Sequence, residues 1–180
     1  MARLLHLLLF LSLSYSAAGW ATTTSSPPAK KLLEEKLTHL HFFFHDVISG
    51  PNATAFPVTG PVRSAGRSAF GRVTMIDDLL TAGPDPTSRP VGRAQGFYAA
   101  AELDELGFLM VMSLAFSAGK YNGSVLSVVG RNQPWHPVRE MAVVGGSGVF
   151  RLARGFALAR THSLRPSTAI VEYNVSVIHY

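Results

Sequence analysis

Short hydrophobic runs separated by turn residues fill almost the whole chain from Leu37 onward. The runs are rich in Val, Phe, Leu and Thr, and the breaks between them contain Gly-Pro and Gly-Gly pairs. This pattern, with almost no helical periodicity, predicts an all-β domain. We expect strands over residues 39–48, 54–59, 70–78, 91–101, 108–116, 124–130, 138–144, 149–153, 156–162 and 169–179.

Many short strands at this spacing fit either a β-sandwich or an antiparallel β-barrel. We favour the barrel, because closure removes the unpaired sheet edges that would be a hazard for such hydrophobic strands. The chain has 180 residues, which is enough for one domain with its own core. It contains no cysteine, so we expect stability from the core or from a closed or oligomeric architecture rather than from disulfides.

The first 21 residues have the pattern of a cleaved signal peptide. Arg3 is followed by a short apolar run, Leu4–Leu13, and then by small residues suited to cleavage. The run is too short to span a bilayer, and no later run is longer and apolar enough to do so. We therefore expect a secreted protein without a membrane segment, consisting of a linker over 22–38 and a β domain over 39–180.

Other features fit export. Asn52 and Asn122 begin glycosylation sequons in turn-like sequence, whereas the sequon at Asn174 lies inside a strand pattern and is a poorer acceptor. The formal net charge is +5, and the basic residues are scattered. This pattern gives no stripe for a phosphate backbone, so we expect no nucleic-acid partner. Retention by acidic polysaccharide and a simple high isoelectric point are equally good readings of the charge.

The run over residues 39–48 reads as a buried strand with a carboxylate where none is expected. With period-two alternation, Asp46 shares one face with Phe42 and Phe44. A carboxylate on such a face is costly to bury unless it is paired, hydrogen-bonded or protonated. Asp46 is therefore either a strand-end residue that reaches solvent or a working acid.

Arg139 is a second charge on an apolar strand face, which it shares with Met141 and Val143. Opposite charges of this kind form a buried ion pair or bind a polar ligand group between them. From the pattern alone, a structural ion pair between Asp46 and Arg139 is the preferred reading.

The strand over residues 91–101 has one face made of Gly and Ala with a single tyrosine, Tyr98. Inside a barrel such a face leaves a cavity to which the phenol is exposed. The alternative is that the small residues permit close packing or a bend of the barrel. Both readings stay open.

Three other motifs do not predict sites. His39, His41 and His45 share one strand face, but they converge on a metal only if the strand is strongly curved, so we expect a partly solvated outer face. The Gly-Gly-Ser-Gly segment at 145–148 lacks the lysine of a phosphate loop and reads as a hairpin turn. The adjacent acids Asp77 and Asp78 point to opposite faces, which disfavours joint cation binding. We expect neither a metal nor a cofactor.

Four segments, in order along the chain, carry a specific resemblance. They are Phe42–Asp46, Val91–Tyr98, Tyr121–Leu126 and Val143–Gly155. Together they resemble the plant dirigent protein family, over a match that runs from about residue 39 to Tyr180.

The resemblance implies an eight-stranded antiparallel barrel, usually a homotrimer although also described as a dimer, exported to the apoplast and often glycosylated. Members of the family have no oxidising centre of their own. A laccase or peroxidase generates phenoxy radicals from phenylpropanoids, and the dirigent pocket orients them so that one stereoisomer of a lignan forms. Some relatives act on quinone methides directly, as in pterocarpan formation.

The family's pocket residues map onto Asp46, Tyr98 and Arg139. Where lignan-forming members have a second pocket aspartate, this chain has Asn132, and a second pocket tyrosine is replaced by Ala100. These departures resemble the branch that includes the pterocarpan-forming members.

We therefore expect a dirigent protein that imparts stereoselectivity on radical coupling of phenylpropanoids, with quinone-methide cyclisation as the alternative. Asp46 is the expected general acid, with Arg139 beside it, while Tyr98 and Arg139 bind phenol oxygens and Asn132 orients the substrate. Two further alternatives are a non-catalytic phenolic or cell-wall binding protein and an isomerase barrel like allene oxide cyclase.

Overall fold

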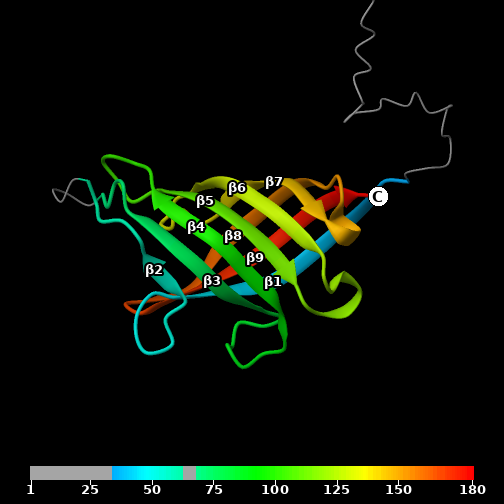
Figure 1. Ribbon diagram of the computed structural model, residues 1–180, viewed down its shortest axis with the longest axis horizontal. Helices are drawn as coiled ribbons and strands as arrows, with labels where there is room; N and C mark the ends of the chain where they lie inside the picture. Colours follow the sequence, from blue (N-terminus) through cyan, green and yellow to red (C-terminus); the bar gives the residue numbers. More distant parts are fainter. Residues whose placement is uncertain (1–33, 63–67) are drawn as a thin grey trace, which may run out of the picture. The chain divides into compact units, whose positions relative to one another are not determined.

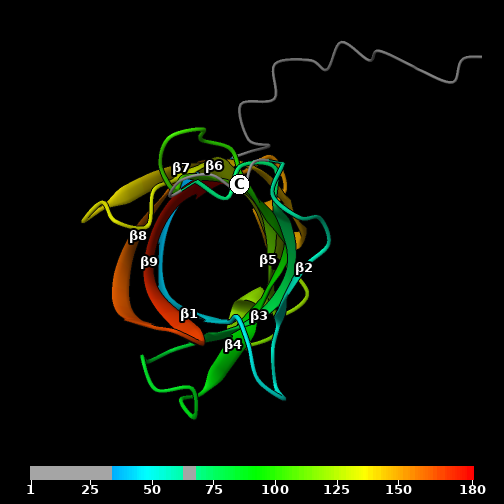
Figure 2. The same cartoon turned by 90° about the vertical axis from the view of Figure 1, so that its left-hand side faces the viewer.

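Antiparallel strands close into a barrel in the computed structural model, which describes residues 34–62 and 68–180. The strands and 3₁₀ helices of this part of the chain are β1 (Lys36–Val47), β2 (Ala55–Pro57), β3 (Val73–Thr81), β4 (Pro90–Ala100), β5 (Phe108–Phe116), η1 (Gly119–Tyr121), β6 (Val125–Asn132), β7 (Arg139–Ser147), η2 (Gly148–Phe150), β8 (Arg154–Arg165) and β9 (Thr168–His179). The sheet runs in the order β1-β9-β8-β7-β6-β5-β4-β3-β2, and β1 also pairs with β3. Eight strands therefore form a closed ring, and β2 adds to the side of β3 (Figures 1 and 2). The expected eight-stranded antiparallel barrel is confirmed.

The strand boundaries differ from the expected ones in two informative places. β1 begins at Lys36, inside the segment expected to be linker. The strand expected over 149–153 is wrong, because η2 and a turn occupy this segment. Gly148 and Leu152 both have positive φ angles, of 64° and 60°, so the chain reverses here and inserts Phe150 into the barrel, where it is fully buried.

The expected signal peptide and the linker up to residue 33 lie outside the described residues. Within the described residues, no helix is long and apolar enough to cross a membrane.

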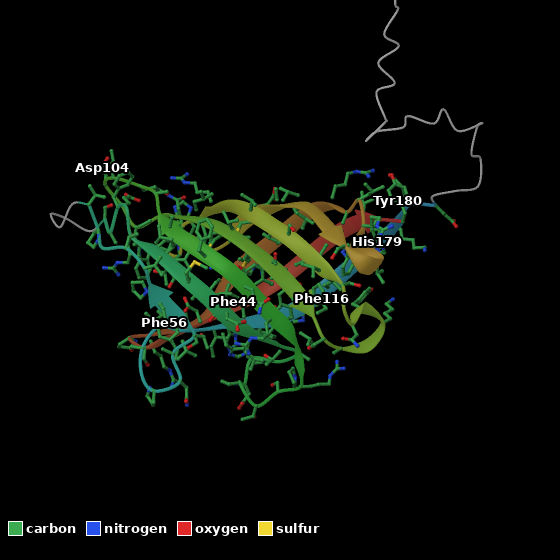
Figure 3. The ribbon with its side chains drawn as sticks, viewed as in Figure 1. Phe44, Phe56, Asp104, Phe116, His179 and Tyr180 are labelled. Atoms are coloured by element: carbon green, nitrogen blue, oxygen red, sulfur yellow. The ribbon has the colours of Figure 1, made fainter. Side chains whose placement is uncertain are left out.

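The barrel interior is filled with aromatic and aliphatic side chains toward one end. Phe150 packs edge-on against Phe116 and His179, with ring centroids 5.7 and 5.2 Å away, and stacks on Tyr121 at 5.0 Å. Figure 3 shows Phe116 and His179 toward this end, Asp104 at the other, and Phe44 between them. A pocket with buried acidic and basic side chains lies toward the other end of β1, which carries Asp46.

The strands β1 and β3, which close the barrel, separate near Asp46. Their register pairs Phe44 with Leu80 and His45 with Leu79. Beyond these pairs Thr54 replaces β3 as the neighbour of β1. Its N–H donates to the Val47 carbonyl at 2.9 Å, and its Oγ1 accepts from the Val47 N–H at 3.1 Å. Thr54 therefore forms the wall behind Asp46.

Candidate functional site

A pocket of about 160 Å³ lies at the end of the barrel where β1 and β3 separate. Its polar lining consists chiefly of Asp46, Tyr98, Asn132 and Arg139, which come from four different strands. The other side chains of the lining are mostly apolar or aromatic, among them Phe44, Phe108, Met110, Trp135, Leu164 and Tyr173. All four residues that the sequence predicted as catalytic or substrate-binding thus face one cavity. A largely apolar pocket with a few convergent polar groups is typical of small-molecule sites.

Asp46 is buried, with 8% of its surface exposed. Burial raises the pKa of its carboxyl to about 6, and a hydrogen bond with Tyr98 opposes this rise. None of the ion pairs among the described residues involves Asp46, so the expected pair with Arg139 is wrong. Of the two readings of Asp46, the geometry supports the buried acid over a solvent-exposed strand end.

Arg139 is held by other partners. Its Nε donates to the Asn132 Oδ1 at 3.0 Å, and its Nη1 donates to the His136 carbonyl at 3.4 Å. Burial lowers the pKa of its guanidinium, although arginine keeps its charge in proteins. Asn132 therefore orients Arg139, and the remaining guanidinium N–H groups are donors available to a ligand in the pocket.

Two buried phenols flank the acid. Burial and the nearby Asp46 raise the pKa of Tyr98, and burial also raises that of Tyr173. Both phenols therefore keep their protons, so that each has an O–H group to donate. Sequence reasoning missed Tyr173, although a period-two face with Val171 and Val175 placed it inside the barrel.

Asp78 is the residue of this region that sequence reasoning most clearly missed. It is fully buried, and the Thr54 hydroxyl donates a hydrogen bond to its Oδ1. Burial and then the charge of Asp46 raise the pKa of Asp78 to about 8. The sequence pattern that pointed to Asp46, a carboxylate on an apolar strand face, is also present at Asp78, which shares a face with Ile76 and Leu80.

Asp77 lies on the other face of β3 and pairs with Arg93 at 2.6 Å. The expectation that Asp77 and Asp78 point to opposite faces is confirmed.

The small residues of β4 serve packing more than cavity formation. A Cβ on Gly92 or Gly96 would collide with the backbone carbonyls of Ala115 or Val111 in β5. Ala94 between them is fully buried in the core. The two strands can approach closely only because these positions are glycine. Tyr98 alone of this face lines the cavity.

The three histidines of β1 do not share one environment. His39 bonds to Ser176 at 3.0 Å and His41 to Glu172 at 2.8 Å on the outer face. His45 is buried, with its Nε2 2.6 Å from the Thr81 Oγ1. The expected solvated face is therefore wrong for His45, because Thr81 of β3 contacts its ring. Among the described residues, no three His, Asp or Glu side chains are grouped to hold a metal ion.

Comparison with known proteins gives a consistent result. The family model for Dirigent-like protein matches residues 37–178. Dirigent protein 21 of Arabidopsis thaliana is 45% identical over 98% of this chain and 97% of its own. Pterocarpan synthase 1 of Glycine max is 48% identical over 94% of each. The solved structure of the pterocarpan synthase dirigent protein GePTS1 superposes with a TM-score of 0.78 at 49% identity, covering 83% of this chain and 88% of that one.

Proposed function

Because the chain belongs to the dirigent protein family, we propose that its pocket binds a phenolic quinone methide and directs a stereoselective ring closure. The observation that carries this proposal is the buried carboxyl of Asp46, which keeps its proton below about pH 6 in an apolar cavity. The similarity to two pterocarpan synthases, from Glycyrrhiza echinata and Glycine max, supports the same choice. It is the alternative that the sequence offered beside radical coupling.

The reaction needs a proton donor and no oxidant. Asp46 donates its proton to the carbonyl oxygen of the quinone methide, which becomes a phenol. A hydroxyl of the same substrate attacks the methide carbon and forms the C–O bond of the new ring. The proton released by that hydroxyl returns to the Asp46 carboxylate, so the net change is an isomerisation.

Stereochemistry follows from how the substrate is held before the ring closes. The Arg139 guanidinium, oriented by Asn132, donates to one phenol oxygen. Tyr98, close to Asp46, donates to another. Between these groups the apolar walls restrict rotation, so that one face of the methide carbon meets the nucleophile. Positioning of this kind lowers the entropic part of the barrier.

Orientation of phenoxy radicals from a laccase or peroxidase remains the second candidate. The observation that favours it is the same pair of phenol-binding donors, Tyr98 and Arg139, because orientation of radicals needs binding groups but no acid. The two functions therefore differ in whether they depend on the proton of Asp46.

A chiral product assay tests both candidates. The purified protein is incubated with an isoflavanol, which forms the quinone methide by loss of water, and separately with laccase and coniferyl alcohol. The products of each arm are resolved by chiral chromatography. We expect one enantiomer in the first arm, and loss of that selectivity in Asp46→Asn but not in Asp77→Asn. If the laccase reaction gives one enantiomer and Asp46→Asn keeps that selectivity, the result favours radical orientation. Racemic products in both reactions at saturating protein would contradict both candidates.

We also propose export to the apoplast with glycans on Asn52 and Asn122, since both side chains are exposed in turns of the barrel. Peptide mass mapping after glycosidase treatment of protein purified from plant tissue checks both positions. Unmodified asparagine at both would contradict this proposal.

A homo-oligomer, a trimer or a dimer, is proposed from the outer surface of the barrel. Leu109 on β5, Val144 on β7 and Phe156 on β8 expose apolar side chains there. A surface of this composition is stabilised by covering it. Light scattering on Val144→Lys, compared with the unchanged chain, is expected to show a smaller assembly. An unchanged mass for a Val144→Lys and Phe156→Lys double variant would contradict this interface.

A further inference from the structure

Asp46 and Asp78 occupy facing positions on the two strands that close the barrel. The antiparallel register pairs Phe44 with Leu80 and His45 with Leu79. Asp46 and Asp78 are the next residues along this register, at the point where the strands separate and Thr54 lies between them. Both acids are buried, and the charge of Asp46 acts on Asp78.

Each of these two carboxyls has one buried oxygen without a partner. They are the Asp46 Oδ1 and the Asp78 Oδ2. The other oxygen of Asp78 accepts from the Thr54 hydroxyl. An unpaired carboxylate oxygen is costly in an apolar wall. One proton held between the two carboxyls gives each unpaired oxygen a partner, because a protonated carboxyl donates and an ionised one accepts.

We propose that Asp46 and Asp78 form a proton-sharing pair, in which Asp78 is a positioning residue that retains a proton for Asp46. The inference rests on the proposed acid role of Asp46, because Asp46 lines the pocket and Asp78 lies behind it. Thr54, which fills the space between β1 and β3, holds Asp78 in place through its hydroxyl.

Within residues 34–62 and 68–180, no ion pair involves Asp46 or Asp78. Tyr98 of β4 and Tyr173 of β9 face the pair as neutral phenols. Arg139 is bound to Asn132. Arg93 and Asp77, which form an ion pair on the outer face of β3, act on Asp78 in opposite directions. Loss of the first proton therefore leaves a charge on Asp46 that holds the second proton on Asp78.

The pair extends the pH range over which the acid can work. When Asp46 donates its proton to a substrate oxygen, the proton of Asp78 moves to Asp46 and the charge passes to Asp78. The proton released by the attacking hydroxyl then restores the pair. Between the two ionisations, at about pH 6 and about pH 8, the pair still holds one proton to donate.

A titration without substrate tests the pair independently of the proposed function. Aspartate carboxyls are isotope-labelled and followed by NMR from acid to alkaline pH in the unchanged chain, Asp46→Asn and Asp78→Asn. We expect midpoints near 6 and near 8 in the unchanged chain and loss of the upper one in Asp78→Asn. In Asp46→Asn the midpoint of Asp78 should fall, because the neighbouring charge is gone. A midpoint for Asp78 that does not change in Asp46→Asn overturns the pair.

The pH dependence of product formation distinguishes this role from a structural one. The ratio of wild-type activity to Asp78→Asn activity should be constant below about pH 6, rise roughly tenfold per pH unit between about pH 6 and pH 8, and level off above that. A purely structural role gives a ratio that does not depend on pH, which would overturn the proposal. Asp77→Asn, the same change one residue away on the outer face, is the matched control.

If Asp78→Asn does not fold, Thr54→Val supplies the second variant, with Thr54→Ser as its control. Removal of the hydroxyl should raise the midpoint of Asp78, because the hydrogen bond that stabilises its carboxylate is lost. If the midpoint of Asp78 is unchanged in Thr54→Val, Thr54 is not the group that holds Asp78. If the two midpoints are found as expected but the protein converts no quinone methide, the proposed function is refuted and the proton-sharing pair still stands.

Discussion

The two ends of the barrel interior are formed by the same strands but differ in their side chains. One end is packed with aromatic rings, and the other carries charged and polar groups. At the packed end, Phe116, Tyr121 and Phe150 contact one another and His179. The buried ring of His179 at this end bonds to the Thr38 hydroxyl at 2.9 Å. At the pocket end, two carboxyls, a guanidinium and two phenols face a cavity or lie directly behind it.

The difference arises mainly from the segments that connect the strands. η1 and η2 carry Tyr121 and Phe150 into the barrel at the packed end. At the pocket end, the connections supply Leu106 and Trp135 to the lining but leave the cavity unfilled. One end therefore contributes core stability, and the other holds buried polar groups beside a cavity. Substitutions at the two ends should consequently separate stability from activity.

Phe150→Ala should give the largest effect, and on stability alone. Phe150 is fully buried among aromatic rings, so truncation removes its burial and leaves a cavity, at a cost of about 3–5 kcal/mol in the free energy of unfolding. Urea denaturation measures this loss, and activity per folded molecule should not change. Phe56→Ala, at an exposed phenylalanine of β2, is the control. Equal losses in both variants would contradict the division between the two ends.

Asp46→Asn should show the opposite behaviour. Removal of a general acid costs about a hundredfold in product formation. The free energy of unfolding should not decrease. Its gain over the unchanged chain should develop between about pH 4 and pH 6 and stay constant above that, because the charge that burial disfavours is no longer formed. Parallel measurements of product and of urea denaturation check both parts. A variant that loses stability together with activity would place Asp46 among the core residues.

The raised pKa values of Asp46 and Asp78 also predict how stability depends on pH. A carboxyl whose pKa is raised on folding contributes stability below its unfolded value and loses it as the pH rises through the folded value. Asp46 acts in this way from about pH 4 to about pH 6, and Asp78 from about pH 4 to about pH 8. The free energy of unfolding should fall by about 1.4 kcal/mol per pH unit for each acid in its window.

Denaturation at several pH values checks this slope. Asp78→Asn should remove the slope between about pH 6 and pH 8. Phe150→Ala, at the packed end, should lower the free energy of unfolding by the same amount at every pH, so that its slope against pH does not change. A slope that survives Asp78→Asn would show that another group causes it.

Much of the pocket end could be predicted from single strands. Period-two alternation of residue types placed Asp46, Tyr98 and Arg139 on inner faces. The observed burial follows that alternation along most of β7, whereas five consecutive residues of β1, Phe42–Asp46, are all buried. The four-segment resemblance added the closure of the barrel and the order of its elements. These predictions depended only on local pattern and family likeness.

The rest depended on which strands become neighbours. Asp78 faces Asp46 because β1 pairs with β3 across the barrel closure, a contact that alternation within one strand does not reveal. The same contact buries His45 against Thr81. Arg139 bonds to Asn132 instead of Asp46 because those two residues lie at the ends of adjacent strands, β6 and β7. Charge complementarity alone therefore suggested the wrong pair.

Arg139→Lys should give the smallest of these effects, at the pocket end only. An ammonium lacks the planar fork that bonds to the Asn132 Oδ1 and the His136 carbonyl together. We expect about a tenfold lower kcat/KM, which is about 1.4 kcal/mol, with a lower enantiomeric excess, because the donor to the phenol oxygen is less well oriented. Arg131→Lys is the matched control on β6, since Arg131 is exposed and pairs with Glu102 at 2.9 Å. Chiral chromatography of both variants measures the difference, and equal enantiomeric excess would mean that the orientation of Arg139 has no part in stereoselectivity.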